Sequence, residues 1–549
     1  MKQRKIIIRI CALAIALMML LTACQKAQEG KIPTPDAGMS SNPTSGATQP
    51  SVPSVTPSQP ATDTAPTAPL PTEPFPTYPE PDDSEDEECI HTDSDSNELC
   101  DICGIDVTVT IDFYGVNDLH GVFCDTENYA GVDELTTYFR NAYADDRAYE
   151  VLISSGDMWQ GSIESNSNRG ALMTKWMNYV GFEAMTLGNH EYDWGSQYIA
   201  DNAAIADFPI LAINVSDVNM DVPYCQPSVI IHRGGVRIGI IGAIGDVKSS
   251  ISGEFTSGLE FAVNDQLTQL VKTEALRLRD LGCDLVVYSL HDGGRGGNAG
   301  AYYDLELSNG YIDLVLEGHS HSSYVFRDGY GVYHLQGGGY GANLSYVSLT
   351  YHLVNDEYQI HTAELIGKSV YANSAMADDP IVQTLITEFF PDGDPYQIPV
   401  GQNRLFRNAK ELRRMLAQLY LQKGEQQWGS QYEIVLGGGY MSCRGKGLSA
   451  GGVTFDELYA LFPFDNDLVL GAISGADLKS KFINSTNSNY FCAYDSSIVS
   501  KIKDNDTYYI ITDTYSSEYA PNNITEVARL TGIYARNLLS DYIATGAWS

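Results

Sequence analysis

Five short apolar runs between residues 107 and 316 each end in a small group of polar residues. The runs are rich in β-branched and aromatic residues and are closed by Gly, Asn or Asp, a pattern typical of buried strands. The polar groups are NDLHG at 117–121, GDMWQGS at 156–162, GNHEYD at 188–193, LHD at 290–292 and GHSH at 318–321. In open α/β sheets, ligands bind beyond the carboxyl ends of the strands. The five loops are therefore expected to converge on one edge of a sheet.

The polar groups contain the ligand types that a pair of divalent metal ions requires. Two such ions about 3.5–4 Å apart need a bridging carboxylate and further N and O ligands on each side. We expect Asp157 to be the bridge. The other expected ligands are Asp118, His120 and His321 for one ion, and Asn189, His291 and His319 for the second. This ligand set accepts zinc, manganese, iron or cobalt.

These motifs carry a resemblance to a known family. The segment from about Val107 to Lys368 resembles the calcineurin-like metallophosphoesterase domain of the secreted 5'-nucleotidase and UDP-sugar hydrolase family. Asn214 and the stretch PYCQPSVIIHRGGVRIGIIGAIG resemble the middle part of that family. The resemblance implies an α/β fold, a four-layer metallophosphoesterase sandwich of two mixed sheets with flanking helices, followed by a smaller α/β substrate domain.

A pair of metal ions in such a fold predicts the hydrolysis of a phosphoester. A metal-bound hydroxide would attack phosphorus in line with the leaving oxygen. His190 is placed to donate a hydrogen bond or a proton to the phosphoryl or leaving oxygen, and Asp193 to orient that imidazole. The resemblance implies that these two residues form the catalytic His-Asp pair. Asp193 could instead cap the helix that follows it.

Residues 401–549 have a mixed pattern that predicts a separate α/β unit. We expect a helix in KELRRMLAQLYLQKG, a strand in YEIVLGGGY, and a helix, a turn and a strand in FDELYALFPFDNDLVLGAI. GGG at 437–439 and FPFDN at 462–466 resemble the C-terminal substrate domain of the same family. The resemblance implies that Phe464 and Tyr515 stack on a nucleobase and that Asn466 makes a polar contact with it. Without the resemblance, Phe464 would be interpreted as a core residue.

The phosphate-binding pattern of this unit departs from that of the family. Leu436 and Met441 replace an Asn and a phosphate-binding Arg. We expect Arg404 and Arg407 to clamp phosphate and Arg444 to take the place of the missing arginine. The preferred substrate is therefore open between a nucleoside monophosphate and another phosphoester.

The N-terminal residues predict export and anchoring. Residues 1–23 begin with basic side chains and continue into an apolar stretch ending LLTAC, which is typical of a lipoprotein signal peptide with Cys24 as the lipidation site. An uncleaved membrane anchor is the alternative. Residues 24–88 are rich in Pro, Thr and Ser and predict a disordered tether. Both interpretations place the rest of the chain outside the cytoplasm, at the outer face of the cytoplasmic membrane.

The chain carries 33 basic and 70 acidic side chains, a formal net charge of −37. Such a chain lacks the basic surface that neutralises a phosphate backbone, so nucleic acid is excluded as a partner. Two divalent ions would still make the pocket locally cationic and suited to an anionic small molecule.

A short segment, 89–104, contains the motif C-x-H-x8-C-x2-C, formed by Cys89, His91, Cys100 and Cys103. These four ligands suit a small structural zinc site. Asp93, Asp95 and Asn97 between them could instead favour calcium, and a segment without metal or one closed by a disulfide is a further alternative.

The leading hypothesis is a lipid-anchored, extracytoplasmic phosphoesterase that hydrolyses nucleotides. The alternatives are a cyclic-nucleotide phosphodiesterase or nucleotide-sugar hydrolase on the same metal centre, and a surface-binding protein without catalysis. The expected organisation is a signal peptide at 1–23, a tether at 24–88, a Cys/His segment at 89–104, a metallophosphoesterase domain at 107–375, a connecting segment at 376–400 and a substrate domain at 401–549.

Overall fold

The structure is a computed structural model. It describes residues 91–546, apart from 96, 124–130, 145–147, 221–222, 252, 295–298, 372–378, 392–397, 441–442 and 445–446. The expected signal peptide, Cys24, the tether and Cys89 lie outside the described residues. None of the helices in the described ranges combines the length and the apolar composition that a membrane crossing requires.

A mixed six-stranded sheet contains the first three of the predicted strands, and its order is β14-β13-β1-β2-β3-β4. Its strands are β1 (Thr108–Val116), β2 (Tyr149–Ser154), β3 (Phe182–Thr186), β4 (Ile210–Leu211), β13 (Asn343–His352) and β14 (Glu357–Gly367). Strands β1 to β4 pair in parallel, whereas β13 and β14 are antiparallel additions. The loops after β1, β2 and β3 therefore leave the same edge of this sheet.

A second mixed six-stranded sheet contains the other two predicted strands, in the order β11-β12-β10-β9-β7-β6. Its strands are β6 (Ser228–Arg233), β7 (Val236–Ile244), β9 (Leu285–His291), β10 (Leu314–Glu317), β11 (Ser323–Arg327) and β12 (Tyr333–Gly337). Strands β7, β9, β10 and β12 pair in parallel, with β6 and β11 antiparallel at the two ends.

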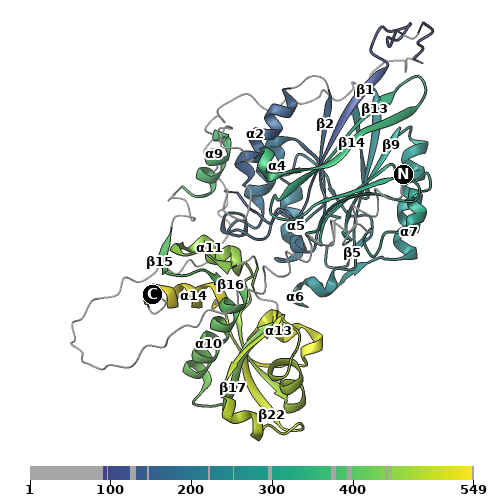
Figure 1. The fold of residues 1–549 in the computed structure, drawn as a ribbon. Helices are drawn as coiled ribbons and strands as arrows, with labels where there is room; N and C mark the ends of the chain where they lie inside the picture. The colour runs from purple at the N-terminus through teal and green to yellow at the C-terminus, as the bar shows by residue number, and fades with distance from the viewer. Residues whose placement is uncertain are drawn as a thin grey trace, which may run out of the picture. The chain divides into compact units, whose positions relative to one another are not determined.

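The two sheets pack face to face and carry helices on their outer faces (Figure 1). In β1, Ile111 and Phe113 belong to the core shared with the second sheet, whereas Tyr114 and Val116 belong to the core beneath the helices. Because successive side chains of a strand point to opposite faces, a strand buried on both faces has a continuous apolar sequence. The helices on the first sheet are α2 (Val132–Tyr143), α4 (Ala171–Val180), α5 (Ser196–Ala203) and α9 (Pro380–Phe389), and α7 (Asp265–Asp280) covers the second. The predicted four-layer arrangement is confirmed.

The C-terminal residues form a five-stranded mixed sheet with the order β21-β17-β22-β20-β23. The strands are β17 (Ile434–Tyr440), β20 (Leu468–Ser474), β21 (Tyr490–Tyr494), β22 (Thr507–Asp513) and β23 (Thr525–Leu530), and the helices α10 (Ala409–Trp428), α11 (Phe455–Leu461) and α14 (Ala535–Ala544). Helix α10 begins where predicted because Asn408 and Glu411 form a capping box. Its residues Leu412, Leu416 and Tyr420 pack in a core of their own.

Short elements complete the fold. They are the strand pairs β5 (Val215–Asp217) with β8 (Leu259–Phe261), β15 (Pro399–Asn403) with β19 (Gly451–Thr454), and β16 (Arg407–Asn408) with β18 (Gly447–Leu448), and the helices α3 (Ile163–Asn166), α6 (Gly253–Thr256), α8 (Lys368–Tyr371), α12 (Gly475–Asp477) and α13 (Thr514–Glu518). Short 3₁₀ helices are η1 (His190–Tyr192), η2 (Lys248–Ser250), η3 (Leu305–Ser308), η6 (Ser496–Lys501) and η7 (Ala520–Asn522), and η5 (Leu478–Ile483) is a π-helix.

Candidate functional site

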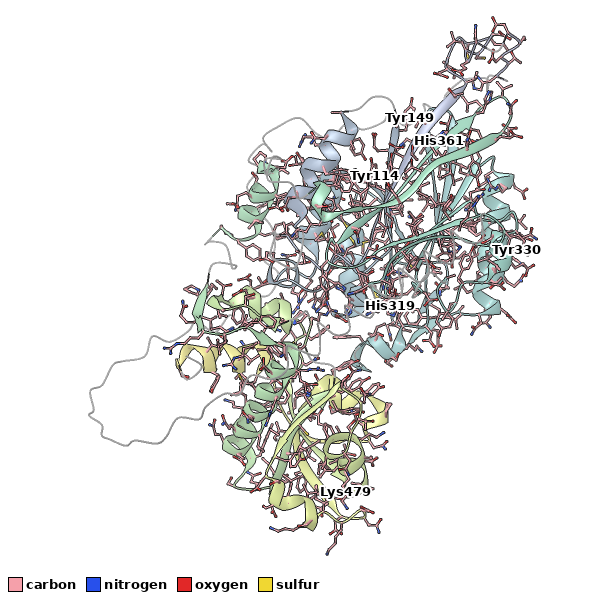
Figure 2. The ribbon with its side chains drawn as sticks, viewed as in Figure 1. Tyr114, Tyr149, His319, Tyr330, His361 and Lys479 are labelled. Carbon is pink, nitrogen blue, oxygen red and sulfur yellow. The ribbon has the colours of Figure 1, made fainter. Side chains whose placement is uncertain are left out.

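The five predicted loops meet at one edge of the paired sheets. They carry Asp118 and His120 after β1, Asp157 after β2, Asn189 and His190 after β3, His291 at the end of β9, and His319 and His321 after β10. Figure 2 shows His319 at the end of the sheets opposite to Tyr149, the first residue of β2, and to His361 of β14. The imidazole of His361 lies 2.9 Å from the hydroxyl oxygen of Thr350, within the sheet and away from the ligand loops.

A first cluster consists of Asp118, His120, Asp157 and His321, which offer ligand atoms that all lie within 4.8 Å of one another. The Nε2 atoms of His120 and His321 are 3.0 Å apart. His321 Nε2 lies 3.4 Å from Asp118 Oδ1, and His120 Nε2 lies 3.9 Å from Asp157 Oδ2. Two carboxylates and two imidazoles thus face one small volume.

A second cluster consists of Asp157, His291 and His319, again within 4.8 Å. The side-chain oxygen of Asn189 adds a fourth donor, at 2.8 Å from His319 Nδ1 and 3.3 Å from His291 Nε2. Asp157 Oδ2 lies 3.4 Å from His291 Nε2. Asp157 is therefore common to both clusters, in the position that the sequence analysis predicted for a bridge.

The backbone at these loops is strained. Five of the clustered residues have a positive φ, namely Asp118 (50°), His120 (55°), Asp157 (56°), His319 (83°) and His321 (52°). Residues other than glycine rarely adopt this conformation, and it collects at sites where the surrounding structure imposes it for function. Gly188 is required for a different reason, because a Cβ atom there would collide with the carboxylate of Asp157.

Three of these groups are in the protonation state of metal ligands, with neutral imidazoles at His120 and His319 and an ionised carboxylate at Asp157. Burial, followed by the charges of Arg444 and His321, holds the pKa of His120 well below its usual range. Burial and His291 lower the pKa of His319 to about 4. Burial opposes the charged form of Asp157, yet His291 and His190 hold its pKa well below the usual value.

His291 differs from the other imidazoles. Although burial opposes its protonation, the charge of Asp157 raises the pKa of His291 to about 10. Nδ1 contacts the backbone oxygen of Ser155 at 2.7 Å, which leaves Nε2 directed at Asp157 and Asn189. A cation bound between these groups would displace the Nε2 proton, because a metal ligand must be deprotonated.

The predicted His-Asp pair is formed. His190 Nδ1 lies 2.7 Å from Asp193 Oδ2, and the backbone N–H of His190 donates to Asp157 Oδ1 at 2.8 Å. Burial opposes protonation of His190, but the carboxylates of Asp193 and Asp157 raise its pKa. The alternative role of Asp193 as a helix cap is not observed, since α5 is preceded by Gly195 at its cap position.

Glu191 is a residue of this site that the sequence analysis missed. Its buried carboxylate accepts four backbone hydrogen bonds, from Asp157 (2.9 Å) and Gly188 (2.7 Å) at Oε2 and from Met158 (2.9 Å) and Trp159 (3.3 Å) at Oε1. Burial, with the charge of Asp157, raises its pKa to about 7. Its position beside the predicted ligands in GNHEYD was a sequence signal that it belongs to the site. The backbone N–H groups that it binds are known only from the folded loops.

Glu191→Gln is expected to destabilise the loop that carries Asp157. The amide nitrogen cannot accept hydrogen bonds, so two of the four backbone N–H groups lose their acceptor in either amide orientation, a loss of about 1–3 kcal/mol per unsatisfied buried group. We expect a lower unfolding midpoint in urea and lower phosphate release. The control, Glu260→Gln, changes a largely exposed carboxylate paired with Lys248, and its stability should stay within about 0.5 kcal/mol of the parent. An unchanged Glu191→Gln midpoint would contradict this role.

A cavity of about 540 Å³ adjoins the clusters and reaches C-terminal residues. Among the predicted residues, the lining includes Asp157, Asn189, His190, Asp193, His319, His321, Arg444, Phe464, Asn466 and Tyr515. Arg404 and Arg407 are not among the lining residues, and Arg407 lies on β16, paired with Leu448. The lining also contains Arg169, Tyr534 and Arg529, which the sequence analysis did not select.

Of the three predicted arginines, Arg444 is the one that lines the cavity, and it contacts the predicted catalytic histidine. One guanidinium nitrogen is 2.8 Å from His190 Nε2 and another is 3.1 Å from His120 Nδ1. The guanidinium carbon lies 4.7 Å from the ring centre of Phe464. Phe464 is half-buried and lines the cavity, whereas its neighbour Phe462 is the buried core residue. Tyr340, also missed, packs its ring 5.0 Å from that of His120.

Comparisons with known proteins agree with this geometry. Residues 111–323 match the family described as calcineurin-like phosphoesterase. Protein UshA of Yersinia enterocolitica is 24% identical over 427 residues, which cover 68% of this chain and 76% of that protein. A 5'-nucleotidase of Diplobatis ommata is 24% identical over 401 residues, which cover 66% of this chain and 67% of that protein.

The solved structure of a 5'-nucleotidase precursor from Thermus thermophilus has a similar fold. It matches with a TM-score of 0.64 at 18% identity and covers 79% of this chain and 96% of that one. Residues 111–323 of the chain therefore form a calcineurin-like phosphoesterase domain, and the chain has proteins named UshA and 5'-nucleotidase among its homologues and shares the fold of a 5'-nucleotidase precursor.

Proposed function

We propose that this chain is an extracytoplasmic 5'-nucleotidase-like enzyme that hydrolyses nucleotides with two divalent metal ions. The observation that carries the proposal is the position of Asp157, which belongs to both ligand clusters and lines the cavity that also contains Phe464. The homologues named 5'-nucleotidase support the choice of substrate class.

The residues of the two clusters fit a pair of divalent ions. Asp118, His120, Asp157 and His321 would hold one ion, and Asp157, Asn189, His291 and His319 the other. All donors are N or O atoms, so zinc, manganese, iron and cobalt are all accepted. When bound, divalent ions would lower the pKa of water toward neutrality and stabilise charge on the phosphoryl oxygens.

His190 is the proton donor of this proposal. Asp193 occupies Nδ1, so the other ring nitrogen, Nε2, faces the cavity and Arg444. A proton held at Nε2 can be given to the leaving oxygen as its bond to phosphorus breaks. Arg444 and a protonated His190 repel each other unless an anion lies beside both of them. We infer that this position receives the phosphoryl group.

Phe464, Tyr515 and Asn466 are the proposed contacts to the nucleobase. Phe464 is free of the core, and an aromatic face can hold a base with a stacking energy of about 1–3 kcal/mol. Leu436, which replaces a polar residue of the family pattern, is fully buried within β17 and does not line the cavity. The presence of Leu436 in place of that polar residue is therefore not expected to alter nucleotide binding.

Phosphate release tests this function directly. We expect the metal-loaded chain to hydrolyse nucleoside monophosphates and a chelator to lower the rate at least about a hundredfold, because the loss of metal removes several kcal/mol of transition-state stabilisation. Zinc, manganese or cobalt should restore the rate. Cyclic nucleotides and nucleotide sugars belong in the same panel. Preference for one of these classes would replace the nucleotidase assignment, and equal turnover with the chelator present would exclude the metal mechanism.

The proposed cellular location of the enzyme rests on the N-terminal sequence alone. The signal peptide, Cys24 as a lipid anchor and the tether to residue 88 place the enzyme at the outer face of the cytoplasmic membrane. We infer a metallophosphoesterase domain at 107–375 and a substrate domain at 401–549, joined by residues 376–400. Cell fractionation, with Cys24→Ser released from the membrane, tests the anchor.

A further inference from the structure

The residues that precede β1 form a tight loop of their own. The backbone N–H of Cys100 donates to the oxygen of Ile105 at 2.7 Å, and the N–H of Asp101 donates to the oxygen of Thr92 at 2.7 Å. An isolated antiparallel β-bridge pairs Leu99 with Asp106, shortly before β1 begins. This loop, 91–106, lies outside the residues 111–323 that match the phosphoesterase family.

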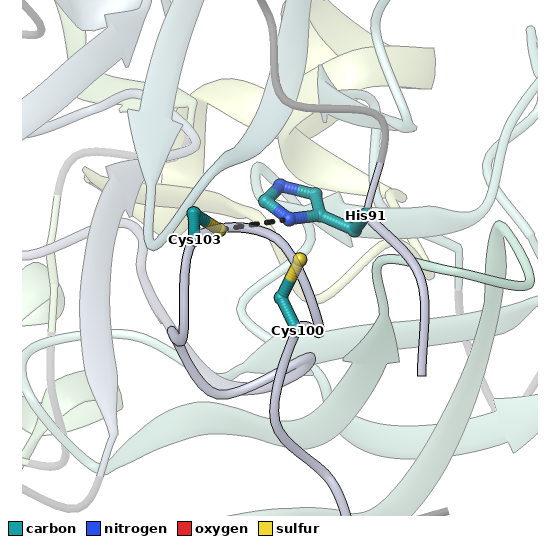
Figure 3. Close-up of side chains that lie close together, drawn as sticks. All are labelled: His91, Cys100 and Cys103. Atoms are coloured by element: carbon teal, nitrogen blue, oxygen red, sulfur yellow. Dashed lines mark hydrogen bonds between the residues drawn. The ribbon is translucent and has the colours of Figure 1, made fainter. Parts of the chain in front are cut away.

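Three soft ligands converge inside the loop. The imidazole of His91 and the thiols of Cys100 and Cys103 offer ligand atoms within 4.8 Å of one another. Figure 3 shows the two sulfur atoms directed toward the ring of His91. Cys100 is 3% exposed, and the N–H of Ile102 lies 3.4 Å from its sulfur. A backbone N–H directed at the sulfur favours the thiolate that a metal needs.

The spacing of these atoms agrees with tetrahedral zinc. Bonds of about 2.3 Å to sulfur and about 2.0–2.1 Å to nitrogen place neighbouring S and N ligands about 3.6 Å apart in a tetrahedron. The observed distance between Cys103 Sγ and His91 Nδ1 is 3.5 Å. Cys103 and His91 therefore already have the separation of two ligands to one ion, and Cys100 lies within 4.8 Å of both.

Apolar burial does not explain why this loop is folded. Its large apolar side chains are exposed, with Leu99 at 47%, Ile102 at 66% and Ile105 at 45%. A segment this short without a core needs a disulfide or a metal to hold its shape. A structural zinc ion supplies that free energy, because its binding is coupled to folding.

The neighbouring acidic side chains are already engaged. Asp93, Asp95 and Asp101 also lie within 4.8 Å of one another. However, Asp93 accepts from the backbone N–H groups of Asn97 and Glu98, and Asp101 accepts from Ser94. These bonds account for the acidic residues as parts of a turn, so their proximity does not by itself require a cation.

We propose that His91, Cys100 and Cys103 bind a structural zinc ion that fixes the loop 91–106 at the start of β1. Cys89, the first cysteine of the sequence motif, lies outside the described residues. The ion is separate from the catalytic centre, because the nine residues of β1 span about 30 Å between this loop and Asp118.

Cobalt distinguishes this site from the catalytic one. Titration of the metal-free, reduced full chain with Co²⁺ should produce a thiolate-to-cobalt charge-transfer absorption, because the loop contributes two thiols, whereas the two catalytic clusters among the described residues consist of carboxylates and imidazoles. Cys100→Ser and Cys103→Ser should each weaken this absorption because each removes one thiolate, the double variant should lose it, and Zn²⁺ should abolish it in the parent. Cys225→Ser, a half-buried thiol outside the loop, and Asp157→Asn should retain it. No absorption in the parent, or absorption of parental intensity in both single variants, overturns the proposal.

Hydrogen exchange tests whether the ion holds the loop. Removal of zinc, or Cys100→Ser, should speed amide exchange at 98–105 by at least about tenfold, since the loop then opens without a core to resist it. Phosphate release by the metal-loaded Cys100→Ser chain should match that of the parent. Exchange that is unchanged by zinc removal overturns the structural role, whatever the outcome for the phosphoesterase.

Discussion

Replacing Asp157 with asparagine should reduce phosphate release by about a thousandfold or more, because a carboxylate that serves two ions contributes several kcal/mol to transition-state stabilisation. Asp157 belongs to both ligand clusters, so the change weakens both sites at once. The change also replaces the negative charge beside His120 and His291 with a neutral amide. A cation bound at either cluster then lacks the carboxylate that both clusters have in common. The measurement is the turnover number together with the metal content of the purified variant.

Asp379→Asn is the matched control for Asp157→Asn. Asp379 is also buried, pairs with Arg140 at 2.8 Å and caps α9, far along the chain from the ligand loops. Asparagine is an equally good helix cap, so this change should lower stability at most modestly and leave turnover and metal content unchanged. An Asp157→Asn chain that keeps its metal and its turnover would refute the shared-ligand role.

Replacing His190 with glutamine should lower turnover by about 100- to 10,000-fold, the usual contribution of a positioned proton donor. The metal content should be unchanged, because His190 belongs to neither ligand cluster. Asp193→Asn should have a smaller effect in the same direction, since Asp193 acts through its 2.7 Å contact with His190 Nδ1. The double variant should be no slower than His190→Gln, because residues that act as one unit are not additive.

The choice of leaving group separates proton donation from simple binding. With p-nitrophenyl phosphate, whose leaving group needs no proton, the His190→Gln defect should largely disappear, whereas it should persist with a nucleoside monophosphate. Equal defects on both substrates would assign His190 to the phosphoryl oxygens instead. His361→Gln, on β14 at the opposite end of the sheets (Figure 2), should be neutral on both substrates.

Much of the catalytic site was predictable from sequence because its information is local. The apolar runs around Ile111 and Val287 are buried on both faces, and such strands leave an unmistakable pattern. Once the strands are placed, the residues that follow them are known, and parallel pairing brings their ends together. Pairing within a sheet does not join the two sets of ligands around Asp157, because β1 to β3 belong to one sheet and β9 and β10 to the other, so the face-to-face packing of the sheets completes the clusters.

The substrate side was predictable only in part. Phe464 and Asn466 line the cavity as expected, but the sequence could not rank the arginines, and Arg404 and Arg407 do not line it. Arg444 does, because the loop after β17 brings it beside His190. An arginine in a loop is part of no periodic pattern, so the direction of its side chain depends entirely on how that loop is packed.

The sequence by itself determined which residues are at the ends of the five strands, because strand periodicity and the polar residues that end each strand are both local properties. Only the tertiary structure decided that the carboxylate of Glu191 binds the loop of Asp157, that Phe464 rather than Phe462 faces the cavity, and that Arg444 contacts His190. These three facts depend on contacts between segments distant in the chain, or on which side of a turn a side chain is buried, and both are settled by packing.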